Sequence, residues 1–246
     1  MTLPLDIRVQ DIDHCGIVAG ICDEMNLVEQ IDRLLGTHPQ EIISAGQVVK
    51  AMILNGLGFV SAPLYLFEKF FVGKATEHLL GEGIRPEHLN DDRLGRVLDK
   101  LYETGLTEVF VTVALCAARK FGVKMDSRHL DSSSFHVDGD YINNGKANIA
   151  EPGGIEITYG YSRDHRRDLK QFILDLMCSG DGDIPLYLRI GDGNESDSAM
   201  MMFYVNTKHN SLLSEISGFS KIRCFLLQAS SSTQLNELPH WQWLWV

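Results

Sequence analysis

Long apolar runs are missing from this sequence of 246 residues. No window approaches the roughly eighteen uncharged apolar residues that a membrane-spanning helix needs. The first six residues, MTLPLD, include neither a basic stretch nor the apolar core of a signal peptide. Hydrophobic residues still make up 44% of the chain, which is enough for the core of a globular protein. We therefore expect a cytoplasmic protein with no membrane partner.

Cysteine is scarce and lacks metal-binding spacing. The chain has five cysteines, and no two of them form a Cys-x-x-Cys pair: Cys15, Cys22, Cys116, Cys178 and Cys224. A disulfide framework needs paired cysteines and a zinc site needs closely spaced ligands, so we expect neither. Buried, reduced thiols are the expected state of these residues.

An excess of positive charge is also absent, because the formal net charge is -11. A protein that coats nucleic acid without sequence preference needs a strongly basic surface, so the charge argues against that class. Local contact with DNA stays compatible with this charge, because acidic metal sites and basic tracks can share one surface.

Residues 1–118 contain apolar residues at the spacing that is typical of helices. Residues 27–35 form one apolar stripe at helical spacing. Ser44 and Gln47 form a capping-box pattern ahead of a second apolar run. Asn90 offers an N-cap for a later helix. We therefore predict a helical N-terminal domain for DNA binding or dimerisation.

The ends of these helices are also marked. Gly105 predicts the C-terminal end of the helix that begins after residue 90. Thr107 predicts the start of a further apolar helix that runs toward Lys120. Pro63 and Pro86 predict breaks between helical pieces.

Beyond residue 118 the pattern changes to that of strands. Residues 139–154 are rich in Gly and Asn, which predicts a loop. Four segments have a strand-like pattern: residues 129–137, 155–159, 172–177 and 185–190. We therefore predict an α+β protein with a second, β-rich domain over residues 119–246.

Asp131 is the first candidate for chemistry, because it lies in a segment predicted to be a strand leading into a loop. A carboxylate at the end of a buried strand is costly unless a partner such as a divalent metal offsets its charge. The alternative is that Asp131 caps a turn through its side chain, and the pattern alone favours that alternative.

A hydrolase is a further interpretation of the same segment. Ser133, His136 and Asp138 supply the residue types of a nucleophile, a base and an acid. However, no Gly-x-Ser-x-Gly elbow surrounds Ser133. Ser133 and His136 are three residues apart, so on a strand their side chains would lie on opposite faces.

Residues 163–170 concentrate positive charge in an otherwise acidic chain. The candidate DNA-contacting side chains are Arg163, His165, Arg166, Arg167 and Lys170. In a connection between strands such residues can lie on phosphates and position DNA. A solvated loop with internal ion pairs is the alternative.

Residues 191–197 predict a tight turn before a helix, and their acids do not follow the order of an EF-hand loop.

Taken in order, four stretches resemble the bacterial DDE-type insertion-sequence transposases. The resemblance rests on residues 90–101, 130–135 and 159–171, and on residues 185–186 together with 193–197. It covers roughly residues 1 to 199. It makes Asp131 the match to the first catalytic acid, ahead of the turn-capping alternative.

The resemblance implies a fold, a cofactor and a partner. The fold is a helical N-terminal domain followed by an incomplete RNase H-like mixed α/β domain. The cofactor is Mg²⁺ or Mn²⁺, held in part by Asp131. The partners are DNA at the terminal inverted repeats of an insertion sequence, and a second copy of the chain or a full-length transposase.

The sequence also departs from the family. Such enzymes need a second Asp and a later Glu, yet residues 224–233 contain no acid where the second Asp is expected. Residues 200–227 lose the family pattern, which a pair of compensating frameshifts followed by a stop would produce. We therefore expect a truncated, catalytically inactive relative for DNA transposition. The alternative is a non-catalytic DNA-binding or partner-binding module that regulates an intact transposase.

Overall fold

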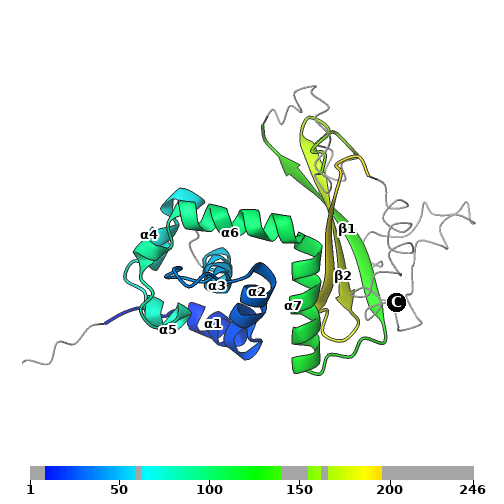
Figure 1. Ribbon diagram of the computed structural model, residues 1–246. Helices are drawn as coiled ribbons and strands as arrows, with labels where there is room; N and C mark the ends of the chain where they lie inside the picture. Colours follow the sequence, from blue (N-terminus) through cyan, green and yellow to red (C-terminus); the bar gives the residue numbers. More distant parts are fainter. Residues whose placement is uncertain (1–8, 59–61, 140–154, 162–165, 196–246) are drawn as a thin grey trace, which may run out of the picture. The chain divides into compact units, whose positions relative to one another are not determined.

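The computed structural model describes residues 9–58, 62–139, 155–161 and 166–195 (Figure 1). These residues form a mixed helical and sheet protein, so the predicted α+β class is confirmed. The chain divides into two compact units. The first is Met1–Gly122 with Tyr187–Arg189, and the second is Val123–Leu186 with Ile190–Val246.

The first unit is helical. In chain order its elements are α1 (Cys15–Glu24), α2 (Leu27–Leu35), α3 (Ala45–Gly56), the 3-10 helix η1 (Leu64–Leu66), α4 (Phe67–Phe71), α5 (Thr76–Leu80), the 3-10 helix η2 (Pro86–His88), α6 (Asp91–Thr104) and α7 (Leu106–Lys120).

The local signals in the sequence set the ends of these helices. Ser44 Oγ accepts a hydrogen bond from the Gln47 N–H, and the Gln47 side chain accepts one from the Ser44 N–H, so the predicted capping box is confirmed. Asn90 caps α6 by accepting from the Arg93 N–H. Gly105 ends α6 with a positive φ of 96°, a conformation that favours glycine.

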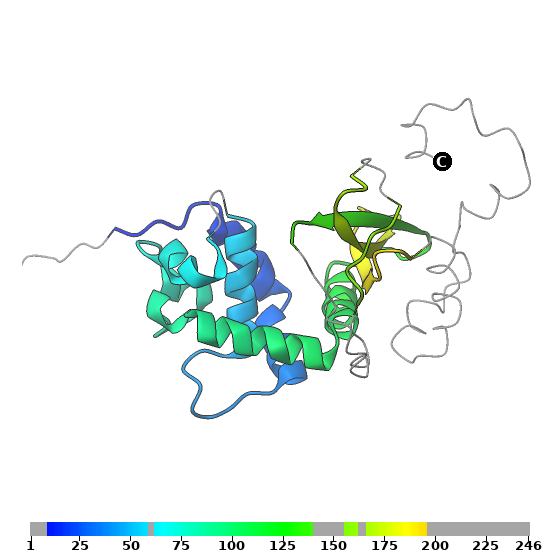
Figure 2. The same cartoon turned by 90° about the horizontal axis from the view of Figure 1, so that it is seen from above.

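The core of the first unit surrounds α3, which packs against α1, α2, α5 and α6 (Figures 1 and 2). Val48, Ala51 and Leu54 of α3 are fully buried. They lie three residues apart, so one face of the helix enters the core. Gly46 allows α3 to approach α2, because a Cβ at this position would collide with the backbone of Val28.

Beyond α7 the chain forms a three-stranded sheet in the order β1-β2-β3, with β1 (Arg128–Val137), β2 (Lys170–Ser179) and β3 (Pro185–Gly191). β1 and β2 belong to the second unit, and Tyr187–Arg189 of β3 are grouped with the first. Three of the four predicted strands are therefore confirmed. The strand predicted over residues 155–159 is wrong, because this segment makes only an isolated antiparallel bridge between Thr158 and Gln171. The loop predicted over residues 139–154 lies outside the described residues from position 140 onward.

The register of β1 against β2 sorts their side chains onto two faces. We call one of them the inner face, which holds Leu130, Ser132, Ser134 and His136 of β1 and Gln171, Ile173, Asp175 and Met177 of β2. The opposite, outer face holds His129, Asp131, Ser133, Phe135 and Val137 of β1 and Lys170, Phe172, Leu174, Leu176 and Cys178 of β2. Burial follows this division, since Ser132, Gln171, Asp175 and Met177 are buried and Asp131, Ser133 and Phe135 are exposed.

No single helix in the described part of the chain has both the length and the apolar character to cross a membrane. α6 and α7 reach the required length and composition only when taken together, and they are bent by 89° relative to each other.

Gly46 and Gly95 make a matched pair of helix substitutions. Gly46→Ala is expected to destabilise the first unit by about 1–3 kcal/mol, because its methyl group would push against the α2 backbone. Gly95→Ala is expected to stabilise it by roughly 0.5–1 kcal/mol, because a Cβ there meets nothing within 4 Å and alanine favours the helix. Urea denaturation followed by circular dichroism measures both changes. A neutral Gly46→Ala would contradict the close approach of α2 and α3.

Candidate functional site

Asp131 lies inside β1 rather than at its end. It is the fourth of ten strand residues, it faces Leu176 on the outer face, and it is exposed. Its Oδ1 accepts a hydrogen bond from the Ser132 N–H at 2.9 Å. The prediction of a carboxylate at the end of a buried strand is therefore wrong, because antiparallel pairing with β2 continues through Val137.

The residues around Asp131 do not fit a magnesium site. Mg²⁺ in a two-metal site needs several converging carboxylates. On the outer face, the β2 residues nearest to Asp131 in register are Leu174, Leu176 and Cys178. The closest acid on β2 is Asp175, and its side chain lies on the inner face. Among the described residues of the sheet, Asp131 therefore has no second carboxylate on its own face.

Asp175 is the buried acid of the sheet, and the pattern of residues 172–177 did not single it out. It is 1% exposed and lies directly opposite Ser132. Ser132 Oγ donates a hydrogen bond to Asp175 Oδ1 at 2.7 Å. A buried carboxylate is costly unless it is hydrogen-bonded, so this contact stabilises the β1–β2 pairing. The available signal was one charged residue in the middle of an apolar strand.

The hydrolase interpretation fails on the same register. Ser133 faces Leu174 on the outer face, whereas His136 faces Gln171 on the inner face. The two side chains therefore lie on opposite sides of the sheet, as their separation of three residues predicts. They cannot act as a nucleophile and its base.

The structure describes three of the five predicted DNA-contacting residues; Arg163 and His165 lie outside the described residues. The exposed Arg166 guanidinium donates from Nε and from an Nη to the two carboxylate oxygens of Asp168, each at 2.9 Å. This contact holds the pKa of the Asp168 carboxyl below its usual range. Arg166 thus matches the alternative of an internal ion pair. Arg167 is exposed, and Lys170 is half-buried at the start of β2.

Gln171 joins residues 158–161 to Gly193 through hydrogen bonds, and we call this group of residues the corner around Gln171. It connects two of the segments on which the resemblance rests. Gln171 donates from Nε2 to the carbonyl oxygen of Gly193 at 2.7 Å and to that of Tyr161 at 3.2 Å. Its backbone also exchanges two hydrogen bonds with Thr158. A Cβ at Gly160 would collide with the Gly193 carbonyl oxygen, so the corner closes only with glycine at position 160. Nothing in the sequence pattern pointed to Gln171.

Aromatic side chains gather on the outer face. Phe135 and Phe172 are direct register partners, and their rings stack with centroids 5.4 Å apart and an interplanar angle of 9°. Tyr159 and Tyr161, beside the corner, are 58% and 79% exposed. These are unusually accessible positions for large rings in a folded segment.

A group of three potential metal ligands lies at the start of α1, far in sequence from Asp131. Ligand atoms of Asp13, His14 and Cys15 lie within 4.8 Å of one another. Asp13, however, already accepts from the Lys74 ammonium at 2.7 Å and from the Cys15 N–H at 2.9 Å. Burial raises the pKa of the Cys15 thiol to about 11, so the thiolate that a metal would need is disfavoured. This group is therefore a structural ion pair between Asp13 and Lys74, in which the Asp13 carboxylate also accepts from the first N–H of α1.

The other described cysteines match the expected buried, reduced thiols only in part. Cys22 is buried, Cys116 and Cys178 are half-buried, and all of them are free. Burial raises the pKa of the Cys22 and Cys178 thiols. Cys224 lies outside the described residues.

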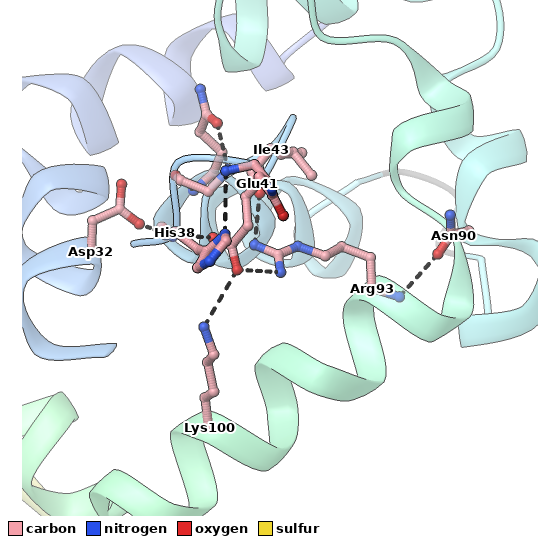
Figure 3. Close-up of polar contacts among 11 residues, drawn as sticks. Asp32, His38, Glu41, Ile43, Asn90, Arg93 and Lys100 are labelled. Atoms are coloured by element: carbon pink, nitrogen blue, oxygen red, sulfur yellow. Dashed lines mark hydrogen bonds and ion pairs between the residues drawn. The ribbon is translucent and has the colours of Figure 1, made fainter. Parts of the chain in front are cut away.

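A second polar cluster connects α6 to the loop before α3 (Figure 3). Glu41 accepts from the Arg93 guanidinium at 2.9 Å and lies 3.5 Å from the Lys100 ammonium. The hydrogen bond from Arg93 holds the pKa of the Glu41 carboxyl below its usual range. Arg93 also donates to the Ile43 carbonyl oxygen at 2.6 Å. An open pocket of about 360 Å³ lies beside this cluster, lined by residues of both charges. The contacts of Arg93 hold the loop onto α6, which is a structural role.

The Asp13–Lys74 pair makes stability depend on pH. Its hydrogen bonds hold the pKa of the folded Asp13 carboxyl well below its usual range. The stabilisation is therefore complete above the unfolded pKa of about 4 and is lost as the pH falls toward the folded pKa. Asp13→Asn should lower the free energy of unfolding by about 1 kcal/mol at pH 7, since the pair is partly exposed, and by less as the pH drops below about 4.

Chemical denaturation at several pH values measures this effect. Asp11→Asn is the matched control, because the Asp11 side chain has no hydrogen-bond or ion-pair partner in the described part of the chain. A deficit of Asp13→Asn that stayed constant with pH would contradict the ion pair.

Gly160→Ala tests the corner around Gln171. The methyl group would collide with the Gly193 carbonyl oxygen and the Gln171 side chain, and we expect a loss of about 1–3 kcal/mol in local stability. Amide hydrogen exchange should show lower protection of the Thr158 and Gln171 N–H groups, which donate to each other's carbonyl oxygens. Gly20→Ala, where a Cβ meets nothing within 4 Å, should leave both amides protected.

Comparison with known proteins gives one limited likeness for the helical part. A family model described as a domain of unknown function (DUF4277) matches residues 7–115. The match ends within α7, covers less than half of the chain, and has a description that assigns no activity. No curated protein and no solved structure matches the chain.

Proposed function

We propose that this chain is a transposase-related protein that binds the ends of an insertion sequence and does not cut them. The observation that carries the proposal is the position of Asp131, the residue that resembles the first catalytic acid. It lies on the first strand of the sheet but has only apolar or uncharged β2 neighbours on its face.

The order of the strands supports the transposase relationship. β1, β2 and β3 are neighbours in chain order, and β1 pairs with β2 in antiparallel register. A sheet that begins in this way, with an acid on its first strand, agrees with an RNase H-like ancestry. The resemblance of residues 130–135 and 159–171 is the sequence support for the same proposal.

The loss of cleavage follows from the carboxylates. Two metal ions that clamp the attacking and the leaving oxygen need carboxylates that converge from several elements. On the outer face of the described sheet Asp131 alone offers one, whereas the Asp175 side chain lies on the inner face and accepts from Ser132 Oγ. The residues that replace the expected second acid in the sequence, 224–233, supply none. The described residues of the sheet therefore do not supply the converging carboxylates with which Mg²⁺ or Mn²⁺ would support strand cleavage.

Binding of a partner protein is the second candidate. α6 exposes Leu98 and Tyr102, which are four residues apart and lie on one side of the helix. In the described residues of the first unit, acids also outnumber Lys and Arg, which favours a protein partner over DNA for this unit. Co-purification with an intact transposase, without retention of the element's ends, would favour this regulatory role.

A nicking and retention assay tests the proposal. The purified chain should leave a supercoiled plasmid carrying the element's ends uncut in Mg²⁺ or Mn²⁺, at the level of the Asp131→Ala control. A duplex with the terminal inverted repeat should be retained in a gel shift by both proteins equally. Nicking by the wild-type chain that disappears in Asp131→Ala would overturn the proposal, because other acids would then complete a site.

A further inference from the structure

We infer that the outer face of the sheet binds unpaired DNA by stacking bases on Tyr159, Tyr161 and Phe135. This inference rests on the proposed function, since it assigns a DNA structure to the same protein. It uses a part of the second unit that the candidate metal site does not need.

The first step is that these rings share one face. Thr158 and Gln171 are directly paired, so their side chains lie on the same face, which is the inner one. Tyr159 lies between Thr158 and Gly160, whose Cβ would point toward the inner-face side chain of Gln171, so we place the Tyr159 side chain on the outer side, where it is 58% exposed. Gly160 approaches Gly193 closely, and Tyr161 directly after it is 79% exposed, which places its side chain away from the buried side of the sheet.

The second step is that the rings are both accessible and held in place. Phe135 is 45% exposed although its ring stacks on that of Phe172. The tyrosine backbone is fixed by the Thr158 bridge and by the hydrogen bond from Gln171 to the Tyr161 carbonyl oxygen. A fixed backbone reduces the entropy that binding would cost.

The third step concerns charge. Lys170 begins β2 on the outer face, and Arg167 is exposed three residues before it. Asp168 is occupied by Arg166, so it repels phosphate less than a free carboxylate would. Asp131, the acid on this face, is four residues from Phe135, about 13 Å along an extended strand. Asp138, exposed directly after β1, also lies near Arg166. In the described residues, this end of the sheet therefore has the three cations Arg166, Arg167 and Lys170 against the two acids Asp138 and Asp168, an excess of one positive charge that suits a negatively charged backbone.

Together these features favour single strands over duplex. A paired base buries its ring faces in the stack, whereas an unpaired base can leave the stack and lie on an aromatic side chain. Sheet faces that bind single strands combine exposed aromatic rings with nearby Lys and Arg. The outer face has both. A protein ligand would not need the basic residues beside the rings.

Fluorescence anisotropy with a labelled short oligothymidine tests this inference on the full chain. Replacing Tyr159 and Tyr161 by Leu should weaken binding by about tenfold or more, because stacking is lost. Replacing both by Phe should keep binding near the wild-type level, because the ring faces remain. Tyr65→Leu is the matched control, since Tyr65 is 74% exposed but lies in the first unit.

Stacking also has its own signature. A 2-aminopurine base in the oligonucleotide should lose fluorescence on binding to the wild type and to the Phe variant, and not with the Leu variant. Arg167→Gln should reduce the salt dependence of binding and leave this quenching in place. Equal binding by the Leu and Phe variants would overturn the inference, as would the absence of single-strand binding by the wild type.

Failure of this inference differs from failure of the proposed function. Retention of the inverted-repeat duplex, with no tyrosine-dependent binding of single strands, would overturn the stacking face alone. Tyrosine-dependent binding of single strands, with no preference for the inverted repeat over an unrelated duplex, would overturn the proposed function alone. Binding of neither nucleic acid would overturn both.

Discussion

The antiparallel register of β1 against β2 is the constraint on which the second unit depends. Asp131 pairs with Leu176 and Ser132 with Asp175, so the two acids lie on opposite faces of one ladder. A shift of the register by one residue would exchange the faces of a whole strand, since side chains alternate with a period of two. The hydrogen bond between Ser132 and the buried Asp175 opposes such a shift, because it would leave a carboxylate without this donor. The register that the Ser132–Asp175 hydrogen bond stabilises on the inner face thus also places the Asp131 side chain on the exposed outer face.

The corner around Gln171 depends on a different kind of constraint, the close approach of backbone to backbone. A Cβ at Gly160 would collide with the Gly193 carbonyl oxygen, and a Cβ at Gly193 would collide with the carbonyl oxygens of Gln171 and Thr158, so neither position tolerates a side chain. The Gln171 side chain donates to the carbonyl oxygens of Tyr161 and Gly193, which lie outside the strands. The same geometry turns Tyr159 and Tyr161 outward. Packing on the inner face and aromatic exposure on the outer face therefore have one structural origin.

In the helical unit, apolar side chains packed around α3 form the core, and ion pairs at the border of this core join α3 and the loop before it to neighbouring helices. Lys50 of α3 is 2% exposed, and its ammonium lies 2.6 Å from Asp23 Oδ1 at the end of α1. Glu41 and Arg93 join the loop before α3 to α6 in the same way (Figure 3). Breaking either pair leaves a charge that is partly or fully out of water, which costs more than an exposed ion pair contributes. These pairs specify how the helices are arranged around the apolar core.

The sequence by itself determined the features that depend on a few neighbouring residues. The Ser44–Gln47 capping box, the Asn90 cap and the Gly105 stop are local hydrogen-bond and backbone effects, and three strand segments followed from composition. Only the tertiary structure decided which face each strand residue occupies, because register is set by contacts between segments about forty residues apart, such as Ser132 with Asp175. For that reason the pattern placed Asp131 at a strand end and overlooked Asp175 and Gln171. It also read residues 155–159 as a strand, since alternation reports burial on one side and cannot report whether a partner strand continues beyond one bridge.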